Sequence, residues 1–124
     1  MTVLMFADRF VQRVKSGEKR HTIRGQRKQP IKPGDGLSLR HWSGKPYRSK
    51  QCVIHDVTCS EVWPIEISET GRVDMGDMIL NHDEREMLAV QDGFKNFAEM
   101  KQWHLNAHGL PFTGVLIEWT VEKS

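Results

Sequence analysis

The chain has 124 residues, of which 38% are hydrophobic and 27% are charged. This length and composition predict one soluble globular domain over residues 1–124 and exclude a disordered or fibrous class. Residues 1–50 carry 13 Lys and Arg against 3 Asp and Glu, a net +10, whereas residues 51–124 carry 5 against 13, a net −8. This split predicts either a basic surface for a polyanion such as nucleic acid or two halves that neutralise each other across a seam.

The sequence has no pattern typical of a signal peptide or of a membrane-spanning segment. The opening MTVLMF is too short for a signal-peptide core and is followed at once by Asp8 and Arg9. No later stretch approaches the ~20 apolar residues that span a bilayer. The sequence therefore predicts a cytoplasmic protein with no membrane partner. Cys52 and Cys59 are expected to be reduced thiols, because their odd separation along a strand would point them to opposite faces.

Residues 1–50 predict short elements separated by turn residues. In chain order these are a buried strand over 2–6, a helix from 8 to about 16, a loop over 25–36 and a strand over 37–41. Asp8 is the predicted N-cap of the helix, and Gly17 is its predicted C-terminal stop.

The remainder of the chain predicts a long β-prone region, two capped helices and a last strand. The expected elements are strand structure over 50–67, a loop or insertion over 68–81, helices after Asn81 and Asn96, and a strand over 113–121. Pro64 predicts an edge, a bulge or a strand end, since proline cannot donate to a ladder. Because this order lacks the alternation of a doubly wound sheet, an α+β fold on a small, strongly bent sheet or barrel is expected.

A basic stretch, GEKRHTIRG, follows the first helix. If it is extended, Arg20, Thr22 and Arg24 share one face, and His21 and Ile23 share the other. A hydroxyl flanked by two guanidinium groups would suit an anionic or carbonyl-bearing ligand. The alternative is a solvated edge strand whose cations block aggregation.

Histidine and tryptophan offer weaker signals. His104 and His108 form an i, i+4 pair that could bind a metal, but no third ligand lies at a recognised spacing, so a structural role is favoured. Phosphate-binding glycine loops and the GxSxG motif are absent from the sequence. We therefore predict no metal and no cofactor. Trp42 lies at a strand end within the basic half, where its ring could stack on a base or belong to the core.

Together these landmarks resemble the ASCH family. The resemblance rests on DRFVQRVKSGEKRHTIRG, similar to the family's helix, glycine and Lys-x-x-Thr-x-Arg signature, followed by KPGDGLSL, AVQDGFKNFAEMKQWH and a closing GVLIEW. It covers most of the chain and implies a PUA-like fold, a small β-barrel of strongly bent mixed sheet with flanking short helices. It also implies a link to RNA.

A small bacterial subgroup of this family hydrolyses the acetyl amide of N(4)-acetylcytidine with a lysine, a threonine and a glutamate. Carried over to this chain, the lysine is Lys19, the threonine is Thr22, and the signature arginine is Arg24. The acid falls on Asp92, where this chain departs from the glutamate by one methylene. A displacement of about 1 Å can cost on the order of a hundredfold in rate, so Asp92→Glu is expected to gain activity if the departure is limiting.

The resemblance implies roles for these residues and leaves several functions open. Lys19 is the expected base and Thr22 the expected nucleophile or water holder, with Asp92 orienting the lysine or protonating the leaving amine. The predicted substrate- or nucleic-acid-binding residues are Arg20, Arg24, Lys28 and Trp42. The partner is RNA or a modified nucleoside, and the leading function is an amidohydrolase. The alternatives are a non-catalytic RNA-binding module, a metal-independent ribonuclease and an adaptor for an acidic protein.

Overall fold

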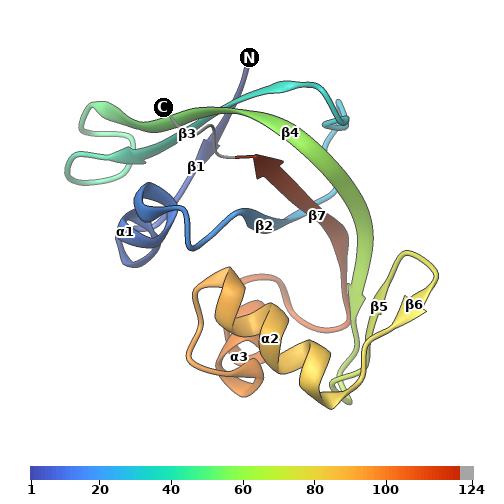
Figure 1. The fold of residues 1–124 in the computed structure, drawn as a ribbon. Helices are drawn as coiled ribbons and strands as arrows, with labels where there is room; N and C mark the ends of the chain where they lie inside the picture. Colours follow the sequence, from blue (N-terminus) through green and yellow to red (C-terminus); the bar gives the residue numbers. More distant parts are fainter. Residues whose placement is uncertain (121–124) are drawn as a thin grey trace.

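The computed structural model describes residues 1–120, in which seven strands and three helices form an α+β fold (Figure 1). The elements are β1 (Thr2–Met5), α1 (Asp8–Ser16), β2 (His21–Gly25), β3 (Gly36–Trp42), β4 (Gln51–Ile67), β5 (Val73–Met75), β6 (Met78–Ile79), α2 (His82–Asp92), α3 (Phe97–His108) and β7 (Phe112–Thr120). The predicted α+β class is confirmed in this form. The segment 68–81, for which the sequence predicts a loop or an insertion, contains the β5–β6 hairpin.

All seven strands belong to one mixed sheet. β1 pairs with β3 in parallel, and every other pair is antiparallel. β4 pairs with β3, β5 and β7; β6 pairs with β5; and β2 pairs with β7. Figure 1 shows β4 curving along its length. Within residues 1–120 the sheet is not closed into a barrel, so the predicted closure is wrong. β1 and β2 are edge strands of this sheet, and a side chain joins them in place of backbone pairing. Arg24 Nη2 of β2 donates to the Met5 carbonyl of β1 at 2.6 Å.

Pro64 lies inside β4 and not at a bulge or a strand end. The bulges fall between Cys59 and Glu61 and opposite Leu39 and Arg40. Pro64 O accepts from Gly76 N at 2.9 Å on the side of β5, just beyond the last β5 pair. The N–H and C=O of one strand residue point to the same side, so an N–H at position 64 would also point toward β5. The pairing with β5 ends at Ile65, so the missing N–H of Pro64 leaves no ladder hydrogen bond unmade there. Of the three predicted placements, only the edge of the ladder fits.

Helix α1 delivers the chain to the basic stretch. Ala7 occupies the N-cap without a side-chain hydrogen bond, so Asp8 is the first helical residue and not the predicted cap. A carboxylate in the first turn still complements the helix dipole. Gly17 ends the helix at φ 85°, in the left-handed region that glycine adopts without strain, as predicted.

Helix α2 ends next to α1, and this contact sets the position of Asp92. The predicted capping box is present: Asn81 accepts from Glu84 N, and the Glu84 side chain accepts from Asn81 N. The helix runs to Asp92, beyond its predicted end near residue 90, and stops at Gly93 with φ 105°. A Cβ on Gly93 would lie 2.8 Å from the Phe10 ring. Glycine thus allows the end of α2 to pack closely against α1.

The core joins α3 and β7 to the rest of the sheet. Asn96 accepts from Glu99 N, and α3 buries Phe97, Met100 and His104. In β7, Leu116, Ile117 and Trp119 are buried. The predicted extension of this strand to residue 121 lies outside the described residues. No helix of residues 1–120 is long and apolar enough to cross a membrane.

Candidate functional site

A buried ion pair joins the basic stretch to the end of α2. Lys19 Nζ lies 2.5 Å from Asp92 Oδ1 and donates to the Asp92 carbonyl at 2.6 Å. The two residues are 3% and 4% exposed. Gly17 turns the chain after α1 so that Lys19 points inward, and Gly93 lets the end of α2 approach it. Two residues separated by 73 positions thereby form one charged unit inside the protein.

Burial and neighbouring charges shift the pKa of both partners. Burial lowers the pKa of the Lys19 amine; Asp92 opposes this shift, and the cations Arg24 and Arg13 add to it. Burial raises the pKa of the Asp92 carboxyl, but His21 and Lys19 lower it more, so that its net direction is downward. His21 Nε2 also lies 3.2 Å from Asp92 Oδ1, in a geometry outside the criteria for a hydrogen bond. Lys19, with contacts of 2.5 and 2.6 Å, is the closer partner of Asp92.

Thr22 and Arg24 lie beside this pair on β2. Arg24 Nε donates to Thr22 Oγ1 at 3.1 Å, and the guanidinium lies 4.9 Å from the centre of the Phe6 ring. Burial lowers the pKa of Arg24 to about 10, which leaves it charged at neutral pH. Together, its bonds to Thr22 Oγ1 and to the Met5 carbonyl mean that Arg24 donates two hydrogen bonds within the protein. The side chain predicted to bind a ligand therefore also holds the Thr22 hydroxyl.

These groups line a cavity of about 260 Å³, which we call the Lys19 pocket. Its polar lining residues are Lys19, Thr22, Arg24, Asp92, His104 and His108, and its aromatic ones are Phe6, Phe10, Phe94 and Trp103. The lining comes from the β1–α1 junction, β2, the end of α2, and α3. Lys19, Thr22 and Asp92, the three predicted catalytic residues, thus share one cavity with an aromatic wall.

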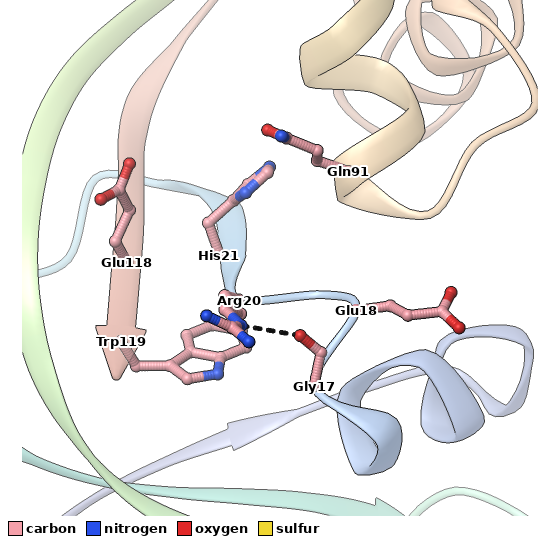
Figure 2. A pocket seen from close by; sticks show the side chains of 7 residues that line it. All are labelled: Gly17, Glu18, Arg20, His21, Gln91, Glu118 and Trp119. Carbon is pink, nitrogen blue, oxygen red and sulfur yellow. Dashed lines mark hydrogen bonds between the residues drawn. The ribbon is translucent and has the colours of Figure 1, made fainter. Parts of the chain in front are cut away.

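Arg20 belongs to a different pocket. A more open hollow of about 470 Å³, the Arg20 pocket, is lined by Gly17, Glu18, Arg20, His21, Gln91, Glu118 and Trp119 (Figure 2). Arg20 Nε donates to Gly17 O at 2.8 Å, and Figure 2 shows His21 pointing toward Gln91. Because β2 begins at His21, the alternation predicted for residues 20–24 does not extend to Arg20, which lines a different pocket from Thr22 and Arg24.

The other predicted binding residues lie on exposed segments. Lys28 is exposed in the loop after β2. Trp42 ends β3 and packs against Tyr47, with ring centres 5.1 Å apart. Tyr47 is 90% exposed and has φ 63°, which is uncommon for a residue other than glycine. We call residues 42–50 the hairpin tip; it also carries Lys45, Arg48 and Lys50, all exposed.

His104 is a pocket residue whose role the sequence did not reveal. The sequence favours a structural role for it. In the structure it is 1% exposed, lines the Lys19 pocket and stacks on His108 with ring centres 6.0 Å apart. Within residues 1–120, no group of three His, Cys, Asp or Glu residues is arranged to hold a metal ion.

The Lys19 pocket combines a buried amine, a carboxylate and a hydroxyl, which are groups that can move a proton and attack a carbonyl. Comparisons of the chain with protein-family models, with curated proteins and with solved structures find no match.

Proposed function

We propose that this protein is a metal-independent hydrolase that removes the acyl group from an N(4)-acetylcytidine-type nucleoside, as an ASCH domain with a PUA-like fold. The observation that supports it most directly is the buried contact of 2.5 Å between Lys19 and Asp92 in a cavity that Thr22 also lines. The shorter acid, which the resemblance placed in doubt, therefore reaches the lysine.

Lys19 is placed to act as the general base. Its ammonium group has three hydrogens, and two of them are directed to oxygens of Asp92. Within residues 1–120 no hydrogen-bond partner takes the third position, which is a hydrogen when the amine is charged and a lone pair when it is neutral, and we assign this position to the reaction. Because burial lowers the pKa of Lys19, a larger fraction of the amine is neutral near pH 7 than for an exposed lysine.

Thr22 supplies the hydroxyl that attacks or that holds the attacking water. Arg24 donates to Oγ1, which stabilises negative charge as the hydroxyl loses its proton to Lys19. The oxygen bonds to the acyl carbon, the C–N bond breaks, and the proton passes from Lys19 to the leaving amine. The products are cytidine and acetate, after hydrolysis of any acyl-threonine by water.

The walls of the pocket suit an uncharged aromatic base. The rings of Phe10 and Phe94 are 5.5 Å apart in an edge-to-face arrangement, and the Phe94 and Trp103 rings are 6.0 Å apart. Aromatic walls contact a flat heterocycle favourably, while the few polar groups set its orientation. The volume of about 260 Å³ admits a pyrimidine with its acyl group.

The experiment is incubation of purified protein with N(4)-acetylcytidine, followed by chromatography for cytidine. We expect product from the wild type and a loss of 100-fold or more, roughly the contribution of a positioned base or nucleophile, in Lys19→Ala and Thr22→Ala. Lys32→Ala and Thr113→Ala, at exposed positions, are the matched controls. Absence of cytidine at high enzyme concentration, or full activity in both pocket variants, removes the proposal.

A second candidate is a non-catalytic RNA-binding module, and the hairpin tip favours it. The Trp42 and Tyr47 rings pack against each other, Arg40, Lys45 and Arg48 lie within a few positions of them in the sequence, and residues 36–55 contain no acidic residue. Aromatic rings among cations suit a single strand, which stacks its bases and is held by its phosphates. Ribonuclease activity in the Lys19 pocket is less well supported, because side chains 3% to 5% exposed are hard for a sugar-phosphate backbone to reach.

Gel shifts with a short single-stranded RNA test this candidate. Trp42→Ala and Tyr47→Ala are expected to weaken binding by about 1–3 kcal/mol for each base that stacks. Trp63→Ala, at a half-exposed position on β4, is the aromatic control. Equal affinity in all three variants, or no binding at low salt, removes the module.

A further inference from the structure

His104 is the buried polar group of the Lys19 pocket that the proposed reaction leaves unused. It is 1% exposed, and neither ring nitrogen has a hydrogen-bond partner within residues 1–120. By contrast, Lys19 is bonded to Asp92, and Thr22 to Arg24. His104 is therefore a pocket-lining imidazole whose hydrogen-bonding capacity the described protein does not use.

Packing alone holds the imidazole in place. The Trp103 ring meets it edge-on at 5.0 Å, the Phe112 ring lies 4.9 Å away, and His108 stacks on it at 6.0 Å. A buried polar group without a partner costs about 1–3 kcal/mol. A residue that only filled this space would be better as an apolar one, because phenylalanine carries no such cost.

The imidazole is uncharged at neutral pH. Burial lowers the pKa of His104 to about 4; the charge of Asp92 opposes this shift, and His108 and Lys19 add to it. A neutral imidazole presents one N–H donor and one nitrogen acceptor. It therefore suits an uncharged ligand edge with a carbonyl, a ring nitrogen or an N–H group, and offers no net charge to a phosphate or carboxylate.

We propose that His104 is a specificity-determining residue that hydrogen-bonds the base edge of an uncharged pyrimidine nucleoside in the Lys19 pocket. The choice of nucleoside follows the proposed function, while the need for an uncharged polar edge follows from His104 itself. A ligand that gives a partner to a buried polar group left unpaired by the protein removes the cost of that unpaired group. Cytosine can accept the imidazole N–H at O2 or N3, whereas an apolar ring of the same size cannot.

The test is isothermal titration with cytidine, which the protein does not consume. His104→Phe is expected to raise the Kd about 10- to 100-fold, the effect of losing one or two buried hydrogen bonds. His104→Gln, which keeps a donor and an acceptor, is expected to recover binding to within about tenfold of the wild type. His82→Phe, at an exposed position at the start of α2, is the matched control and is expected to bind cytidine as the wild type does.

Thermal unfolding without ligand separates this role from a structural one. Because His104→Phe removes two buried unpaired nitrogens, we expect its unfolding midpoint to equal or exceed that of the wild type. Three results overturn the proposal: an unchanged Kd in His104→Phe, a raised Kd that His104→Gln does not recover together with a lower midpoint, or no cytidine binding by the wild type.

The outcome is distinguishable from that of the proposed function. Cytidine binding that depends on His104, without hydrolysis of N(4)-acetylcytidine, supports the role of His104 and refutes the hydrolase. Hydrolysis with the same KM in the wild type and His104→Phe supports the hydrolase and refutes the role of His104.

Discussion

The Lys19 pocket and the hairpin tip use the same kinds of side chain in opposite surroundings. In the pocket, Lys19 is 3% exposed and bonded to Asp92; at the tip, Lys45 and Arg48 are exposed beside Tyr47, which is 90% exposed. Burial forces a charge to take a partner and lowers the pKa of the amine, which makes it a candidate base. Exposed cations attract polyanions in a salt-dependent manner. The two regions therefore suit different tasks, one chemical step and one long-range attraction.

Breaking the buried pair is expected to have the largest effect on stability. Lys19→Met leaves the Asp92 carboxylate buried without its main partner, which should cost about 3–5 kcal/mol of unfolding free energy. Lys45→Met at the hairpin tip should change it by less than about 0.5 kcal/mol. Urea denaturation of both variants makes the comparison.

A double variant separates the charge from the packing. If the loss in Lys19→Met reflects an unpaired charge, adding Asp92→Leu should recover much of it, because apolar pairs often replace buried ion pairs without loss. Equal unfolding free energies for Lys19→Met and Lys45→Met would contradict the assignment of Lys19 as a buried, paired cation.

Acid is expected to lower the unfolding free energy of the protein first through a group in the Lys19 pocket. Because the pKa of His104 is lowered from 6.5 to about 4, the unfolded chain binds a proton in this range that the folded protein does not. Unfolding free energy should therefore fall as pH falls from 6.5 to about 4, by up to about 3 kcal/mol. Asp92, whose pKa lies below its ordinary value, adds its loss only at lower pH.

Denaturation of His104→Phe across the same pH range is the control. That variant lacks the titrating imidazole, so its unfolding free energy should fall much less between pH 6.5 and 4 than that of the wild type. A fall as steep as that of the wild type would assign the acid sensitivity to another group.

Lengthening the acid tests the fit of the buried pair. Asp92 is 4% exposed and already reaches Lys19, so an added methylene must move the carboxylate or the amine from its present position. Asp92→Glu is therefore expected to destabilise the protein by about 1–3 kcal/mol and to gain no hydrolase activity. The sequence alone favoured a gain if the shorter acid was limiting. A rise in kcat/KM for Asp92→Glu would restore that view.

The smallest effect is expected at the hairpin tip. Lys45→Gln should reduce the slope of log affinity for single-stranded RNA against log salt by roughly 0.7, the value for one phosphate contact. Lys32→Gln, in the loop before β3, measures the background from general charge. Slopes that are equal in both variants would place the RNA contact elsewhere.

Local signals were enough to predict much of the fold. The capping box at Asn81 and the left-handed glycine at position 17 are confirmed, because a cap depends on residues within one turn. The residues left a bent sheet and a barrel both open, and the barrel that the resemblance implied is wrong for residues 1–120. Whether β1 and β2 pair depends on contacts between distant segments, and here Arg24 and Met5 make a single bond in place of a ladder.

The site was predictable only in part, because it too depends on contacts between segments that are distant in the sequence. Lys19, Thr22 and Asp92 were chosen by resemblance, and the structure brings them to one pocket. The strand alternation places Arg20 with Thr22 and Arg24, but β2 begins only at His21, and Arg20 lines a different pocket. The sequence shows the i, i+4 spacing of His104 and His108, but only the surroundings of the ring show that the His104 nitrogens lack partners within residues 1–120.

The most direct test of the central claim is the pH dependence of N(4)-acetylcytidine hydrolysis. If Lys19 is the base, kcat/KM should rise with pH through an apparent pKa below 10.5, and Lys19→Ala should lose that rise together with most of the activity. A wild type that forms no cytidine, or a pH profile that Lys19→Ala leaves unchanged, would contradict the claim.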